Sequence, residues 1–115
     1  MRDDHERVID IIEAIERIEK ITSKGKRVFY DDEMVQVWVI HHLQIIGEAA
    51  WRLAQPLKDQ HPQIPWRLIA GMRHAIVHDY FEIDWNEVWN TATRDVPALR
   101  PLIDVVLQSL PPDQP

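Results

Sequence analysis

The chain has 115 residues, no cysteine and a formal net charge of −6, from 13 Lys and Arg against 19 Asp and Glu. This length fits one domain that buries about two-thirds of its unfolded surface without a disulfide or metal staple. The lack of cysteine excludes disulfides and thiol catalysis. The acidic balance argues against a broad basic surface, so any polyanionic ligand must meet a local positive site.

No segment has the basic-then-apolar pattern of a signal peptide, and no apolar run reaches the ~18 residues of a membrane helix. We therefore expect a soluble, cytoplasmic protein that does not contact membranes. Only three glycines occur beside five tryptophans and 45% hydrophobic residues. That mix favours packed helices over strands and tight turns.

The first half of the chain predicts two helices. Apolar residues recur at three- and four-residue spacing from about Asp4 to Lys20, which indicates an amphipathic helix. Residues 23–27 carry a glycine among polar and basic residues and are expected to form a connection. The longest helix is then expected to begin at an N-cap on Asp31 and to continue until Pro56.

The second half begins with a proline-marked loop over residues 58–65. Pro65 suits the first position of a third helix, which is expected to run through about Val77. Asp84 and Glu87 match the capping-box pattern and predict the start of a fourth helix.

Pro97 and Pro101 bracket the expected start of a last helix, and residues 111–115 are expected to fray. Residues 1–110 therefore predict a single all-α domain, a compact antiparallel bundle of about five helices joined by short connections.

One short segment concentrates reactive side chains. Residues 73–80 read RHAIVHDY, with an arginine, two histidines, an aspartate and a tyrosine. Histidine can act as acid or base near neutral pH, and arginine offers a cationic fork that matches phosphate oxygens. On an ideal helix Arg73 and His78 lie about 140° apart, so the long arginine stem would have to bring the two groups together.

Two other interpretations of this segment stay open. Arg73, His74 and His78 can be a solvated helix face, with Tyr80 as a half-buried anchor. Alternatively, His74 and His78 are four residues apart and could chelate zinc, although the sequence places no third ligand.

The segment GMRHAIVHDY, with arginine, four residues, histidine, one residue and tyrosine, resembles the signature of HEPN-domain proteins of the HepT-like toxin group. The resemblance extends to IIGEAA at residues 45–50, to PWRLIAGMR at residues 65–73 and to the Asp-Trp start of the next helix. It covers nearly the whole chain in order. His74 departs from the pattern, because a small polar amide commonly follows the arginine in the family.

The resemblance implies a small all-α, HEPN-like homodimer that cleaves RNA without a metal or other cofactor. Such proteins are typically encoded with a nucleotidyltransferase-fold antitoxin, which in some systems attaches AMP to the motif tyrosine. By position, Arg73 and His78 would be the catalytic pair and Tyr80 the modification site, with His74 and Asp79 in supporting or substrate-positioning roles. A different function is a non-catalytic partner subunit of a nucleotidyltransferase, which binds nucleotide or substrate with Arg73 as a phosphate clamp.

The chemistry of RNA cleavage also favours a dimer. Cleavage through the 2′-hydroxyl of RNA needs a base, an acid and positive charge on the transition state. A two-fold dimer that buries the polar side of the third helix, including Ala70 and Val77, would bring both copies of Arg73 and His78 toward the axis. Two arginines in one cleft would supply the local positive site in an acidic protein.

Overall fold

The structure, a computed structural model, describes residues 2–74 and 83–111. Within these residues it contains seven α-helices, one π-helical segment and no strand, so the predicted all-α fold is confirmed. None of the described helices is long and apolar enough to cross a membrane. The three longest helices are α1 (Asp4–Thr22), α3 (Glu33–Arg52) and α7 (Val96–Ser109).

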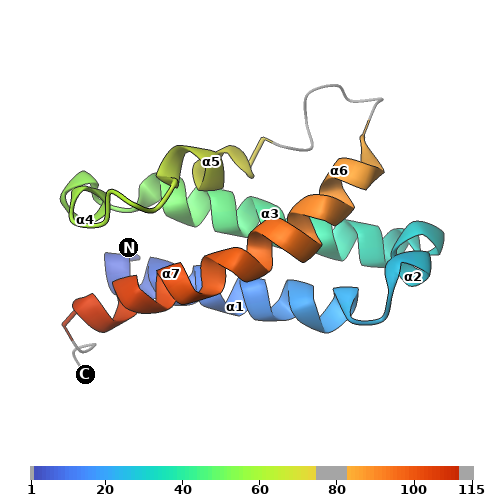
Figure 1. Cartoon of the computed structure of the whole chain (residues 1–115), viewed down its shortest axis with the longest axis horizontal. Helices are drawn as coiled ribbons and strands as arrows, with labels where there is room; N and C mark the ends of the chain where they lie inside the picture. Colours follow the sequence, from blue (N-terminus) through green and yellow to red (C-terminus); the bar gives the residue numbers. More distant parts are fainter. Residues whose placement is uncertain (1, 75–82, 112–115) are drawn as a thin grey trace.

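Helix α1 lies at the centre of the packing. It runs away from the N-terminus, while α3 and α7 both return toward the end at which α1 begins (Figure 1). The core is formed mainly where α1 packs against α3 and α7, and α5 packs on α3 from the other side. The largest side chains with under 2% exposure come from all of these helices and from α2: Ile11, Ile15, Ile18, Phe29, Leu43, Ile46, Ile69 and Ile103.

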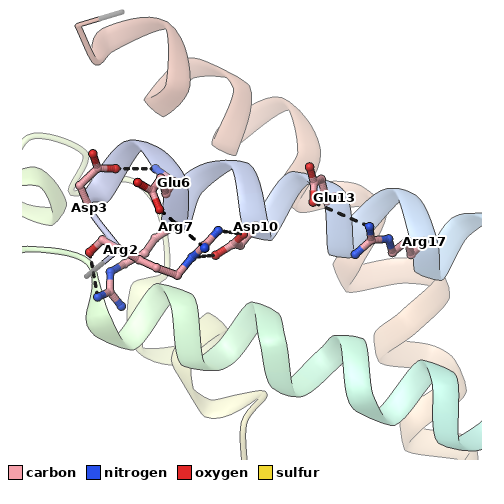
Figure 2. Close-up of polar contacts among 7 residues, drawn as sticks. All are labelled: Arg2, Asp3, Glu6, Arg7, Asp10, Glu13 and Arg17. Carbon is pink, nitrogen blue, oxygen red and sulfur yellow. Dashed lines mark hydrogen bonds and ion pairs between the residues drawn. The ribbon is translucent and has the colours of Figure 1, made fainter. Parts of the chain in front are cut away.

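The outer side of α1 carries charged pairs (Figure 2). The Asp3 carboxylate caps the helix by accepting a hydrogen bond from the Glu6 backbone N–H at 2.8 Å. Arg2 Nε donates to Asp10 at 2.7 Å. Exposed pairs of this kind contribute at most about 1 kcal/mol, so burial of the apolar face holds α1 in place.

The connection between α1 and α3 differs from the sequence expectation. Gly25 has a φ of 105°, which favours glycine, and the short helix α2 (Lys26–Asp31) begins directly after it. The predicted N-cap at Asp31 was wrong, because Asp31 is the last residue of α2. The extended residue Asp32 caps α3 instead, with its carboxylate accepting from the Met34 N–H at 2.9 Å.

The end of α3 also comes earlier than predicted. The helix ends at Arg52 with Leu53 in an extended conformation, rather than continuing to Pro56. Pro56 lies in the first turn of α4 (Gln55–Asp59), where the N–H that proline lacks has no helical partner to lose. Helix α4 therefore takes the first two residues of the predicted loop 58–65.

The C-terminal helical segments follow one another without a break from residue 85 to residue 109. Helix α6 (Trp85–Asn90) begins as predicted, with the Asp84 carboxylate accepting from the Glu87 N–H at 3.1 Å. It then continues through the π-helical segment η1 (Thr91–Asp95) into α7, instead of stopping before a separate last helix. Pro97 accounts for the widened turn, because it cannot donate to the carbonyl four residues earlier and its ring crowds that carbonyl.

An aromatic cluster joins α2 to α6. The Phe29 ring makes an edge contact with Trp85 at 5.9 Å between centroids and a tilted contact with Trp89 at 5.3 Å. The Tyr30 hydroxyl donates a hydrogen bond to the Asn86 side chain. These contacts fix where the chain re-enters the bundle after residue 82.

Candidate active site

Arg73 lies just beyond the end of a short helix. Helix α5 (Trp66–Gly71) ends at Gly71, and residues 72–74 form a turn in which the Arg73 N–H donates to Ala70 and the His74 N–H to Gly71. The predicted continuous helix from Pro65 to Val77 is therefore wrong over residues 72–74. The ideal-helix angle between Arg73 and His78 does not apply.

Gly47 sets the position of this turn. A Cβ atom at residue 47 would lie 2.2 Å from the Arg73 backbone nitrogen and 2.9 Å from its Cα. Only a residue without a side chain lets the turn pack directly on the backbone of α3. This explains a glycine inside a long helix, where it is about 1 kcal/mol less favourable than alanine.

Three side chains hold the Arg73 guanidinium. Its Nη1 lies 3.5 Å from the Glu48 carboxylate, and its Cζ lies 4.1 Å from the centroid of the Trp51 ring. Its Nε donates to His74 Nε2 at 3.1 Å. The Arg73 side chain is still 23% exposed. The guanidinium is thus oriented and remains accessible to a phosphate.

Glu48 links two arginines. Its carboxylate accepts from Arg52 Nε at 2.6 Å and contacts Arg73 at 3.5 Å. The hydrogen bond from Arg52, followed by the charges of Arg52 and Arg73, holds the pKa of Glu48 below its ordinary value. Two cations therefore share one carboxylate, which makes a local positive site in an acidic chain.

Most of the predicted motif lies outside the described residues. His78, Asp79 and Tyr80 fall within residues 75–82, so the structure brings together only Arg73 and His74. In the parts of the chain that are described, no group of three or more His, Cys, Asp or Glu side chains could hold a metal ion. The alternative His74–His78 zinc pair lies partly outside these residues.

Sequence reasoning missed the residues that support Arg73. Gly47 and Glu48 lie within the IIGEAA segment, where a glycine inside a helical pattern is itself a sign of close backbone packing. Trp51 is 52% exposed. A large aromatic residue at the end of an amphipathic helix, off its apolar stripe, is the signal that could have identified it.

Comparison with known proteins agrees with the motif. The sequence model of the family described as "Ribonuclease HepT-like" matches residues 11–106, which include Arg73 and the whole RHAIVHDY segment.

Two relatives show the extent of the similarity. A protein from Thermococcus cleftensis named "Probable ribonuclease HepT" is 42% identical over 92 residues, 79% of this chain and 84% of its own. A protein from Caldanaerobacter subterraneus subsp. tengcongensis, named as a candidate RNase, is 32% identical over 94 residues, 82% of this chain and 81% of its own. No solved structure matches the chain. The family match and these two relatives place the chain in the HepT-like ribonuclease family.

Proposed function

We propose that this chain is an endoribonuclease toxin that cleaves RNA without a metal ion, with Arg73 and His78 as its catalytic pair. The observation that carries the proposal is the Arg73 guanidinium, held by Glu48 and Trp51 yet accessible at the end of α5. It directly precedes the segment that contains His78. Membership of the HepT-like ribonuclease family supports the same reaction.

The chemistry needs few groups. A base takes the proton of the 2′-hydroxyl, and the 2′-oxygen then attacks the adjacent phosphorus. The bond from phosphorus to the 5′-oxygen breaks, and that oxygen receives a proton from an acid, which leaves a cyclic phosphate and a 5′-hydroxyl. His78 supplies proton transfer, and Arg73 stabilises the extra charge on the phosphoryl oxygens. His74 is a positioning residue, because its ring accepts the hydrogen bond from Arg73.

The proposal includes a homodimer. A second copy that packs on the outer side of α5 would bring two copies of Arg73 and His78 to one cleft. Leu68, on that side of α5, is 75% exposed, which is unusual for leucine and suits a covered surface. The shared cleft would provide both an acid and a base.

The proposed partner is a nucleotidyltransferase-fold antitoxin that attaches AMP to Tyr80. Tyr80 follows His78 by two residues, so an attached AMP would place a phosphodiester anion near Arg73. That anion would compete with the RNA phosphate and repel the incoming strand.

A metal-free cleavage assay tests the enzyme. We expect purified protein to cleave RNA in EDTA, and Arg73→Ala or His78→Ala to lower the rate about 10²- to 10⁴-fold without loss of helix content. Arg27→Ala is the control, because the Arg27 side chain is 94% exposed on α2 and lies far along the chain from the site. Cleavage by His78→Ala at the wild-type rate would refute the assignment, and no turnover with retained nucleotide binding would favour the non-catalytic partner subunit. Strong inhibition by EDTA would favour the zinc pair.

Mass spectrometry tests the antitoxin. Co-expression with the cognate nucleotidyltransferase should raise the intact mass by one or more AMP units, and Tyr80→Phe should abolish the increase while the fold is kept. An unmodified chain that is still inhibited would mean that the antitoxin acts by binding alone.

A further inference from the structure

A second feature lies beside Arg73. A cavity of about 330 Å³ is formed by the end of α3, by α4 and by the start of α5. Its wall includes two indoles, from Trp51 and Trp66, and two cations, Lys58 and Arg67. Trp51 is shared by this cavity and the candidate active site, because Arg73 stacks on its ring. A strand whose phosphate contacts Arg73 is therefore next to this cavity.

The two indoles differ in how they are held. Trp66 Nε1 donates to the backbone carbonyl of His61 at 3.1 Å, and the buried His61 is itself hydrogen-bonded to Ser109 at 3.1 Å. Trp66 is therefore fixed to the bundle before any ligand arrives. Trp51 is half exposed and has Arg73 and Arg52 over its ring. Aromatic side chains that are already ordered stack bases at low entropic cost.

The charges around the cavity favour an anion. Arg67 is exposed and has no ion pair or hydrogen bond with any residue that the structure describes. Lys58 Nζ donates to the carbonyls of Ala50 and Trp51, both at 3.3 Å, and so offsets the negative end of α3. Asp59 is the carboxylate of the wall, and it accepts from Gln55 at 2.9 Å. The wall of the cavity thus carries two cations, Lys58 and Arg67, and one carboxylate, Asp59.

We propose that this cavity is a nucleotide subsite, which binds one residue of the RNA strand next to the phosphate held by Arg73. The base stacks on the indole of Trp66, beside Trp51, whose ring already carries Arg73, and the backbone phosphate lies near Arg67. The proposal rests on the proposed ribonuclease function, whose substrate it describes in more detail. Because stacking reads no base edge, the subsite requires a base and tolerates any sequence.

The test compares binding of two strands that cannot be cleaved. One probe is a labelled 2′-O-methyl oligoribonucleotide, and the other is the same strand with abasic residues. Trp66→Leu should weaken binding of the first about 5- to 150-fold and leave binding of the second unchanged. Trp38→Leu is the matched control, since Trp38 is also partly exposed and its Nε1 also donates to a backbone carbonyl, that of Arg17 at 3.1 Å. It should change neither.

Two further variants separate stacking and charge from folding. Trp66→Phe keeps an aromatic ring and should retain most of the binding that Trp66→Leu loses. Arg67→Ala should lower the slope of log affinity against log salt by about 0.7, the value for one phosphate contact on a single strand. Arg27→Ala removes the same charge from α2, at the opposite end of the bundle (Figure 1), and should leave the slope unchanged.

Three results would overturn the subsite. Equal losses on the two strands would mean that Trp66 acts only through the fold. A Trp66→Phe variant as weak as Trp66→Leu would exclude stacking. Free AMP that binds more tightly than the strand, in a manner that depends on Trp66, would assign the cavity to a free nucleotide.

The proposed function is judged separately, by cleavage of unmodified RNA. Failure to cleave, together with Trp66-dependent binding, would remove the ribonuclease and leave the nucleotide site. Cleavage of RNA, together with binding that does not depend on Trp66, would keep the ribonuclease and remove the nucleotide subsite.

Discussion

Gly47 shows how one missing side chain positions another. The α3 backbone at Gly47 touches the turn that carries Arg73. The Arg73 side chain then contacts Glu48, the residue after Gly47, and Trp51, one turn further along α3. The orientation of the guanidinium thus depends on a backbone contact as much as on its polar partners.

Gly47→Ala should therefore lower both stability and cleavage. Alanine favours a helix by about 0.8–1.0 kcal/mol over glycine, but its Cβ would lie 2.2 Å from a backbone atom, which cannot rotate away. Overpacking of this kind costs about 1–3 kcal/mol, so the clash outweighs the propensity. Urea denaturation and the RNA assay measure the two effects. Gly71→Ala is the control, since no described atom beyond its own helix and chain neighbours lies within 4 Å of its added Cβ, and it should be neutral or slightly stabilising.

His42 predicts a pH dependence of stability. The side chain is 3% exposed, its Nδ1 donates to the Trp38 carbonyl at 2.7 Å, and burial lowers its pKa from 6.5. The unfolded chain therefore binds a proton more readily than the folded one. The contribution of neutral, buried His42 to the free energy of unfolding is fully present above about pH 6.5. It is lost as the pH falls through the lower pKa that His42 has in the folded chain.

The free energy of unfolding should accordingly decrease below about pH 6.5, by at most about 1.4 kcal/mol per pH unit from this group. Urea titrations at several pH values measure it. His42→Gln should flatten this part of the profile. An unchanged slope in His42→Gln would assign the pH dependence to another group.

At the scale of elements, amphipathic spacing predicted the buried faces well. The apolar stripe from Val8 to Ile18 is the core face of α1, and the Asp84 cap begins α6 where the pattern placed it. The pattern failed where neighbouring residues compete for one role. Asp31 and Asp32 are both suitable caps, and only the formation of α2 through Asp31 decides between them.

This choice between caps can be tested. Asp32→Ala should destabilise the protein by about 1 kcal/mol, because the Met34 N–H loses its acceptor at the start of α3. Asp31→Ala should cost much less, since among the described residues Asp31 makes only an exposed ion pair with Arg27 at 3.6 Å. Thermal or urea unfolding of the two variants compares them directly. Equal losses of stability in Asp32→Ala and Asp31→Ala would mean that the Asp32 cap contributes no more to α3 than the exposed Asp31 does.

The candidate site was only partly predictable for a related reason. The motif identified Arg73 and His78 as the catalytic pair, and His78 lies outside the described residues. His74, which was expected only in a supporting role, is in contact with Arg73. Glu48 and Trp51 lie more than twenty residues earlier in the chain. Their proximity to Arg73 follows from how α5 packs on α3, which no local pattern encodes. Periodicity also extended the third helix through Arg73, although the chain turns after Gly71.

At the scale of the whole molecule, two surfaces could receive a second copy. One is the outer side of α5 with Leu68, next to Arg73. The other is on α3, where Met34 is 82% and Val37 58% exposed. Only the first is adjacent to Arg73 along the chain, and the proposed composite cleft requires it.

Mixing two inactive variants tests the composite cleft. The Arg73→Ala and His78→Ala variants should each be inactive, but in the proposed dimer their subunits should exchange after mixing and brief partial denaturation. A mixed dimer keeps one Arg73 and one of the two His78 side chains in the shared cleft, so it has arginine and one proton-transfer group where each parent lacks one of the two. Cleavage should therefore return to a small fraction of the wild-type rate, which rises with the share of mixed dimers. Light scattering reports the oligomeric state. The double variant Arg73→Ala, His78→Ala, mixed with either single variant, gives the baseline rate. If the mixture stays inactive although mixed dimers form, one Arg73 and one His78 from different chains do not suffice, and this form of the shared cleft is refuted.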